Sequence, residues 1–496
     1  MAVNMSQRIS SDTVSQSTAW RWMFGLTIAA IVTRVVHLNS GLWLDEYYSI
    51  VEQFRYTPLQ VFTTYIGDNQ HPLYALLASI SLSLFGEDAW TARLPAALFG
   101  IASIPALYIF AAQVTRRKEA ILAAALLAFS YHHVWFSQNA RGYTAIALAA
   151  ILCSFYLMRL FNNGTKRDAL MYGVIAALGA YAHLTMVFVV VGHFLVYVLI
   201  QLVSLIKNKR LANWSLPLLA FVAAGGLTLV LYGPILSQVI DFFVNKPSLG
   251  NLSSPSWALQ EAIRSLSLGF GASIIVLSGL LMVVVGFVSY LRSMPVALGV
   301  FVLPIVVTLF VATMARGTMY PRFFFAVIGM AILIGVRGVM VTVNWCVKLV
   351  YHGKNREVLA ERMATAAMIF TILVSAASLL RNYQHPKMDF AAAQQWLETT
   401  ASKKDVIVTA GSAAWPFREY YKLPWPEMIT AEDLATQDNL ATSQGGNVLV
   451  VYAFARYMEV SAPDVLQSIR DRCTNKKRFV GTLGGGDLFV CRLRSI

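Results

Sequence analysis

Residues 94–114, LPAALFGIASIPALYIFAAQV, form an apolar run without a single Lys, Arg, Asp or Glu. A helix needs roughly 20 such residues to cross the hydrocarbon core of a bilayer. Comparable runs recur along the chain with short loops between them. The pattern therefore predicts an α-helical, polytopic membrane protein.

Composition supports the same fold class. Of the 496 residues, 57% are hydrophobic and only 13% are charged, whereas soluble domains carry about a quarter charged residues. This excludes a water-soluble globular protein. The net charge of +14 is assigned to basic loops that orient the helices rather than to nucleic-acid binding. The first apolar run, 20–38, lacks a convincing cleavage site and is interpreted as a retained helix.

About eleven apolar runs are predicted to be transmembrane helices. They cover residues 20–38, 94–114, 119–136, 141–161, 168–182, 184–206, 212–233, 271–291, 295–314, 321–342 and 362–380.

A twelfth apolar segment, 72–86, is short for a crossing and is predicted to be a juxtamembrane or re-entrant helix. If it crossed, the basic loops would lie outside, against the positive-inside rule. These loops are Arg116–Lys118, 159–167, Lys207 to Arg210 and 348–362. With this parity the N-terminus and the basic loops are cytoplasmic. The outward loops are then 39–93, 137–141, the turn near 183, 234–270 and 315–321.

The chain changes character near residue 381, so we divide it into a transmembrane part, 1–381, and a small extracytoplasmic α/β domain, 382–496. A helical pattern at 389–401 is followed by the short apolar runs DVIVTAG and NVLVVYAF and by a terminal hairpin-like pair. The glycines at 484–486 are interpreted as the turn of that pair, not as a phosphate loop. Export of this domain would allow Cys473 and Cys491 to form a disulfide, whereas the sequence alone leaves the pairing open.

The outward loops carry acidic residues in unusual surroundings. Asp45 and Glu46 lie in LWLDEYYSI, just after the first helix. A carboxylate among aromatic rings is suited to deprotonating a hydroxyl, although an ordinary interfacial acid beside an aromatic belt is an equally good interpretation. Asp68 and His71 are candidates for binding sugar hydroxyls, or for a divalent metal site with Asp45 and Glu46. A solvated loop is the alternative.

Arg141 lies at the outer start of a helix, in SQNARGYT, beside Gln138 and Tyr143. Its planar guanidinium group is suited to bidentate binding of a phosphate. An arginine that extends from the interface toward water is the alternative.

Arg316 and Arg322, with Tyr320, lie in the outward segment ARGTMYPRFFF. Arginines on the outer side run against the charge rule, which favours a role in holding an anionic ligand. His183, in YAHLTMVF, is more often a packed, hydrogen-bonded residue than a ligand, and it is retained as a candidate substrate-binding residue.

Carboxylates and arginines on one face indicate sugar transfer from a lipid phosphate. An arginine stabilises the charge that develops on the departing phosphate, and a carboxylate activates the attacking oxygen. A transporter or flippase of a lipid-linked substrate is the main alternative, but transporters tend to place ionisable residues near the membrane midplane in related halves. A catalytically inactive envelope subunit is the third hypothesis.

The motifs, taken in order, resemble those of the GT-C glycosyltransferases, particularly the bacterial relatives of protein O-mannosyltransferases and of the lipid A aminoarabinose transferase. The resemblance covers roughly residues 40–330. Its motifs are LWLDEYYSI, DNQHPLYALL, ARLPAALFG, WFSQNARGYTAIAL, AYAHLTMVF and YPRFFFAV.

This resemblance implies that Asp45 is the catalytic acid/base with Glu46 beside it, and that Arg141 and Arg322 contact the carrier phosphate. It also implies an undecaprenyl- or decaprenyl-phosphate sugar donor, inversion by a single displacement, and an acceptor that is a glycolipid, a polysaccharide or a protein of the envelope. The expected location is the bacterial inner membrane, with the site facing the periplasm. One departure concerns the donor headgroup, because QHPLY lacks the lysine of the aminoarabinose transferase pattern.

Overall fold

A computed structural model describes residues 14–245, 260, 263–264, 273–314 and 321–494. The chain divides into two compact units. The first comprises Met1–Val36, Pro58–Ser81 and Arg93–Leu379, and the second comprises His37–Thr57, Leu82–Ala92 and Leu380–Ile496. The second unit thus contains the C-terminal sheet together with part of the first predicted outer loop.

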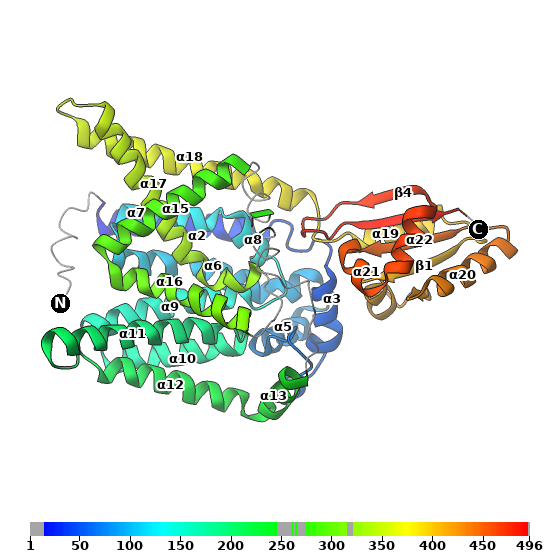
Figure 1. The fold of residues 1–496 in the computed structure, drawn as a ribbon, viewed down its shortest axis with the longest axis horizontal. Coiled ribbons are helices and arrows are strands. Elements are labelled where there is room, and N and C mark those ends of the chain that lie inside the picture. The colour runs from blue at the N-terminus through cyan, green and yellow to red at the C-terminus, as the bar shows by residue number, and fades with distance from the viewer. Residues whose placement is uncertain (1–13, 246–259, 261–262, 265–272, 315–320, 495–496) are drawn as a thin grey trace. The chain divides into compact units, whose positions relative to one another are not determined.

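The first unit is helical (Figure 1). Its elements are α2 (Gln16–Val35), α4 (Pro58–Thr63), α5 (Pro72–Phe85), α6 (Ala89–Val114), α7 (Arg117–Ala128), α8 (Tyr131–Ser137), α9 (Tyr143–Asn162), α10 (Lys166–Ala182), α11 (Met186–Asn208), α12 (Ser215–Tyr232), the 3₁₀ turn η2 (Gly233–Ile235), α13 (Leu236–Asn245), α15 (Ser273–Ser293), α16 (Pro295–Met314), the 3₁₀ helix η4 (Pro321–Val327), α17 (Ile328–Val350) and α18 (Arg356–Gln384). Of these, α5, α6 and α18 each extend into the second unit.

All eleven predicted spans coincide with helices where the structure describes them. By length and composition, seven described helices are able to cross a membrane, or eight if one bent pair counts as a span. The chain is therefore a multi-span membrane protein, while the number of crossings stays a prediction.

The bent pair corrects the prediction of a continuous helix over 119–136. α7 and α8 meet at an angle of 56°. The hydroxyl of Ser130 accepts a hydrogen bond from the backbone N–H of His133 and so begins a new helix.

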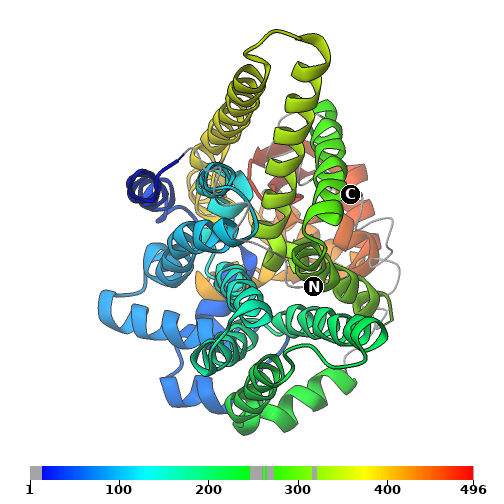
Figure 2. The ribbon, with the colours of Figure 1, turned by 90° about the vertical axis from the view of Figure 1, so that its left-hand side faces the viewer.

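The long helices run alongside one another and are seen end-on in Figure 2. α10 packs against α9 and α12, α11 against α16, and α15 against α17. The last pair approaches closely at two glycines. A Cβ at Gly286 would lie 1.9 Å from the carbonyl oxygen of Ile334, and one at Gly338 would lie 1.8 Å from that of Met282. Small residues at such crossings increase the van der Waals contact between membrane helices.

The second unit contains a five-stranded sheet of order β2-β1-β3-β5-β4. Its strands are β1 (Val406–Gly411), β2 (Glu427–Met428), β3 (Val448–Ala453), β4 (Cys473–Phe479) and β5 (Leu488–Leu493). β2, β1 and β3 are parallel, whereas β5 pairs antiparallel with both β3 and β4. Its other elements are α3 (Leu44–Ser49), the π-helix η1 (Ile50–Phe54), α19 (Phe390–Thr400), the π-helix η5 (Pro416–Tyr420), α20 (Ala431–Ser443), α21 (Ala455–Ser461) and α22 (Pro463–Arg472).

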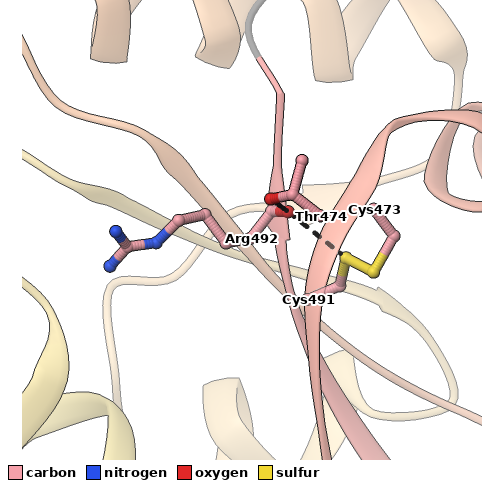
Figure 3. Close-up of a disulfide and its surroundings, with 4 residues drawn as sticks. All are labelled: Cys473, Thr474, Cys491 and Arg492. Atoms are coloured by element: carbon pink, nitrogen blue, oxygen red, sulfur yellow. Dashed lines mark hydrogen bonds between the residues drawn. A yellow bond between two sulfur atoms is a disulfide. The ribbon is translucent and has the colours of Figure 1, made fainter.

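This sheet confirms the predicted α/β character of the tail and its terminal hairpin. The turn of the hairpin includes Gly485, whose φ of +75° is costly for other residues. Cys473 on β4 and Cys491 on β5 form a disulfide with a Cα–Cα distance of 5.7 Å (Figure 3). Disulfides persist mainly in oxidising compartments.

Candidate functional site

A polar cluster lies at one end of the helical bundle, where the loop before α5 meets the start of α9. Arg141 donates a hydrogen bond from Nη1 to the amide oxygen of Asn69. The backbone N–H of Gly142 donates to Nδ1 of His71 at 2.9 Å. Arg141 and His71 are buried, with 3% of each residue's surface exposed. The side chain of Arg141 and the backbone N–H of Gly142 thus connect the start of α9 to the loop before α5, about seventy residues earlier in the chain.

Gly142 allows this contact because it has no side chain. A Cβ there would lie 2.4 Å from the carbonyl oxygen of Ala182 and 2.7 Å from Nδ1 of His71. Any larger residue would separate the start of α9 from the end of α10 and from the imidazole. The sequence prediction omitted Gly142 and Asn69, since one glycine or asparagine in a loop gives no signal of a close contact.

The hydrogen bond from Gly142 fixes the tautomer of His71. Because Nδ1 accepts, the neutral ring carries its proton on Nε2. This Nε2 is buried and has no hydrogen-bond partner among the residues that the structure describes. The cluster thus contains a buried N–H donor that no described residue uses.

His183 and Tyr143 belong to the same cluster, and the ring of Phe323, which follows Arg322, lies 6.4 Å from that of His183. The rings of His71 and His183 are 4.4 Å apart between centroids, and those of Tyr143 and His183 are 5.2 Å apart. The guanidinium carbon of Arg141 lies 6.0 Å from the centroid of Tyr143.

Burial and nearby positive charge lower the pKa values of both His71 and His183. Burial, followed by the charge of Arg141, lowers the pKa of His71 well below its usual range, with smaller contributions from His183 and Arg322. Burial and the charges of Arg141 and Arg322 lower the pKa of His183 to about 3. Both rings are therefore neutral near pH 7, and two guanidinium groups from distant segments act on the same space.

Two other predicted residues of this unit have different surroundings. Gln138 is buried, and its amide nitrogen donates to the carbonyl oxygens of Arg34 and Val36 at 3.0 and 2.5 Å, so it anchors the end of α2. Asp68 is exposed in the loop before α5. Arg316 and Tyr320 lie outside the described residues.

The predicted carboxylates belong to the second unit, at the start of α3. Glu46 is completely buried and accepts a hydrogen bond from the backbone N–H of Trp43 at 3.2 Å. It therefore caps its own helix. Asp45 is half-buried. These positions indicate different roles for the two acids.

Aromatic contacts hold α3 against the C-terminal domain. The hydroxyl groups of Tyr47 and Tyr421 are 2.7 Å apart in a hydrogen bond. The ring of Tyr47 lies 5.3 Å from that of Phe390, and Tyr48 lies 5.3 Å from Trp415. Asp45 therefore lies on a short helix that Tyr47 and Tyr48 hold in place through their contacts with the C-terminal domain.

The predicted metal site gains no support from the geometry. Within the part of the chain that the structure describes, no group of three or more His, Cys, Asp or Glu side chains is arranged to hold a metal ion. Glu46 is engaged by its helix start and Nδ1 of His71 by Gly142.

A protein-family model matches part of the chain. Residues 69–228 match the family model described as dolichyl-phosphate-mannose-protein mannosyltransferase. No curated protein sequence matches the chain.

Solved structures match over nearly the whole chain. ArnT from Cupriavidus metallidurans in the apo state is 12% identical, with a TM-score of 0.56 over 96% of this chain and 98% of that one. The same protein bound to undecaprenyl phosphate gives 12% identity and a TM-score of 0.55, with coverage of 97% and 98%. The oligosaccharyltransferase AglB from Archaeoglobus fulgidus, in complex with an inhibitory peptide and a dolichol-phosphate, is 12% identical. Its TM-score is 0.51 over 95% of this chain and 74% of that one.

These matches confirm the resemblance found in the motifs, and the chain has the fold of the GT-C glycosyltransferases.

Proposed function

We propose that the protein is a glycosyltransferase that moves a sugar from a polyprenyl-phosphate donor to an acceptor of the cell envelope. The observation that carries this proposal is the position of two arginines around His183. Arg141 lies 6.0 Å from the ring of Tyr143, which lies 5.2 Å from His183, and Phe323, the neighbour of Arg322, lies 6.4 Å from His183 on the other segment. Two guanidinium groups around buried neutral imidazoles favour an anionic ligand, and arginine binds phosphate oxygens in pairs.

The comparisons support a lipid phosphate as that anion. ArnT has been captured with undecaprenyl phosphate, and AglB with a dolichol-phosphate. The family model that matches residues 69–228 is named for a dolichyl-phosphate-mannose donor. A carrier of this kind also accounts for a charged cluster at the end of a membrane bundle, since its phosphate lies near the membrane surface while its chain stays in lipid.

In the proposed reaction Asp45 accepts the proton of an acceptor hydroxyl as its oxygen attacks the anomeric carbon. The bond between that carbon and the phosphate oxygen breaks, and its electron pair leaves with the polyprenyl phosphate. Arg141 and Arg322 stabilise the charge gained by the phosphate, and the Nε2–H of His71 is a further donor for the same oxygens. A single displacement inverts the anomeric centre. Glu46 fixes the start of α3 and is a positioning residue.

We propose that both groups of residues act on the extracytoplasmic side of a bacterial inner membrane. α3 packs on the C-terminal domain, so Asp45 and this domain belong to the same side. The Cys473–Cys491 disulfide favours an oxidising compartment for that side. The basic loops favour the cytoplasm for the opposite side. In this proposal residues 1–381 form the membrane part and residues 382–496 the exported domain.

The function is tested with the purified full-length protein in detergent, radiolabelled undecaprenyl-phosphate sugars, and envelope extract from cells that lack the protein. We expect label to move into the extract and free undecaprenyl phosphate to accumulate. A detergent solution has no two compartments, so this turnover is not transport. Binding of the donor without any transfer, across hexose and pentose donors, would contradict an enzymatic role.

A further inference from the structure

The C-terminal domain has a cavity of about 350 Å³ at the carboxyl ends of its parallel strands. Gly411 and Ser412 at the end of β1, Glu427 and Ile429 around β2, and Tyr457 on α21 contribute to its lining. β1 connects to β2 on one side, and the chain then returns to β3 on the other side of β1. In open α/β sheets, ligands bind outside the carboxyl ends of the strands where the strand order reverses in this way.

Two parallel strands end at a residue with left-handed backbone: Gly411, which lines the cavity, and Phe454, three residues before Tyr457 of the lining. Gly411, which ends β1, has a φ of +57°. Phe454, which follows β3 and caps α21, has a φ of +51°. The conformation is unfavourable for a phenylalanine, and strained residues of this kind concentrate at ligand sites. The strain is therefore an observation independent of the cavity.

The lining combines aromatic surfaces with planar charged groups. Trp415 is half-buried, and 46% of Tyr457 is exposed. Arg418 donates from Nη1 to Oε2 of Glu427 at 2.8 Å. Apolar C–H faces of a sugar ring stack on aromatic rings, while its hydroxyl groups pair with guanidinium, carboxylate and hydroxyl groups. The cavity has the size of a small-ligand site.

Several polar groups of the lining are available to such a ligand. Among the residues that the structure describes, the indole N–H of Trp415, the hydroxyl of Ser412 and the hydroxyl of Tyr457 have no hydrogen-bond partner. They alternate with the apolar surfaces of Ile429 and the two aromatic rings. This mixture is suited to a neutral polyhydroxy ligand.

The adjoining helix disfavours a phosphate or nucleotide in the same place. α20 begins after β2 with Glu432 and Asp433 in its first turn. The carboxylate of Asp433 accepts hydrogen bonds from the backbone N–H groups of Ile429 and Thr430 at 3.2 and 2.8 Å. The backbone N–H groups at this helix start already donate to the carboxylate of Asp433, and its negative charge would repel a second anion.

Leu44 forms another part of the lining. It immediately precedes Asp45 at the start of α3, and Tyr48 of the same helix lies 5.3 Å from Trp415. The cavity and the proposed general base therefore belong to one packed unit. A sugar bound in the cavity would contact Leu44, the residue directly before the proposed base Asp45.

We propose that this cavity binds a monosaccharide unit of the acceptor, so that the acceptor is itself a glycan or a glycolipid. The inference rests on the proposed function, since it names the acceptor class of the same reaction. Trp415 and Tyr457 provide the stacking surfaces, and Arg418 and Glu427 orient the hydroxyl groups.

The test is saturation-transfer NMR on the purified full-length protein with methyl glycosides of glucose, N-acetylglucosamine, mannose and arabinose. We expect at least one glycoside to bind. Trp415→Ala and Tyr457→Ala are each expected to weaken that binding about tenfold or more, and Trp415→Phe is expected to retain it. Trp396→Ala is the matched control, because Trp396 lies on α19 against Phe479 and does not line the cavity. If Trp415→Ala does not fold, the glycoside affinity of Tyr457→Ala alone tests the proposal.

Undecaprenyl phosphate is titrated into the same samples. Donor binding to the wild type without binding of any glycoside would overturn the cavity proposal and leave the proposed function intact. Unchanged glycoside affinity in both aromatic variants would also overturn it. Failure of the wild type to bind undecaprenyl phosphate would instead count against the proposed function itself.

Discussion

The two ends of the helical bundle use positive charge in different ways. At the end with the basic loops, cations pair with carboxylates: Arg337 with Glu119 at 2.8 Å, Lys118 with Glu361 at 3.0 Å, and Arg159 with Asp168 at 2.9 Å. At the other end Arg141 donates to the amide of Asn69 and faces Tyr143. There burial, followed by the charges of Arg141 and Arg322, lowers the pKa values of His71 and His183.

The two ends therefore place their cations next to different groups. A cation that faces an acid satisfies that acid and holds two helices together. At the other end, the planar guanidinium groups of Arg141 and Arg322 beside buried neutral imidazoles suit the phosphate of the proposed donor. In the proposed function the basic end contributes packing and orientation, and the end with Arg141 binds the donor phosphate.

The largest effect is expected for Asp45→Asn, which removes the general base and keeps the shape of the side chain. Such groups contribute about 10²- to 10⁴-fold to rate, so we expect transfer to fall by that factor while undecaprenyl phosphate still binds. Glu357→Gln, at the basic end, is the control and should transfer sugar at the wild-type rate. Comparable turnover in the two variants would remove the base assignment.

Arg141→Ala is expected to weaken binding of undecaprenyl phosphate by about 10- to 100-fold, since hydrogen bonds to charged groups contribute roughly 1.5–3 kcal/mol. Arg141→Lys should lose less, because it keeps the charge without the planar fork. Equilibrium binding in detergent measures both. Arg159→Ala removes an arginine from the other end. If it weakens donor binding as much as Arg141→Ala does, the contrast between the two ends is wrong.

Gly142→Ala tests the close contact that builds the cluster. The new methyl group would lie 2.4 Å from the carbonyl oxygen of Ala182, and overpacking of this kind costs about 1–3 kcal/mol. We expect a melting temperature several degrees lower and a few-fold weaker donor binding. Gly225→Ala, on α12 with open space around its Cβ position, is the matched control. A wild-type melting temperature in the Gly142 variant would show that the contact is looser than described.

The smallest expected effect is a pH dependence of stability. The pKa of His183 is about 3 in the folded protein and near 6.5 when unfolded. Between these values the unfolded chain binds a proton that the folded chain does not, so stability falls as pH decreases from 6.5 toward 3. His183→Gln should make the decline of melting temperature over this range shallower. An identical slope in the variant and the wild type would argue against a buried neutral imidazole.

The sequence predicted the fold well because apolar run length is a strong signal. Helices occupy all eleven predicted segments where the structure describes them, and the α/β tail and the two cysteines of the disulfide were also predicted. It failed at 119–136, where composition is continuous but the Ser130 cap breaks the helix. It also missed β2, which has only two residues and is set by its pairing with β1.

The candidate site was predictable in part. Arg141, His71, His183 and Arg322 stand out as polar residues beside apolar runs, and the fold gathers them. Asn69 and Gly142 matter through contacts with segments far along the chain, which one sequence does not reveal. Asp45 and Glu46 look alike in LWLDEYYSI, and only the hydrogen bond from Trp43 to Glu46 distinguishes them.

The contrast between the two ends is tested most directly by their accessibility across the membrane. Asp68→Cys, before α5, and Asn163→Cys, after α9, place single thiols at exposed positions, with Cys346 replaced by serine. In intact spheroplasts, a membrane-impermeant maleimide is expected to label residue 68 and to reach residue 163 only after the membrane is opened. Labelling of residue 163 but not residue 68 in intact spheroplasts would place the arginine cluster in the cytoplasm and contradict the account.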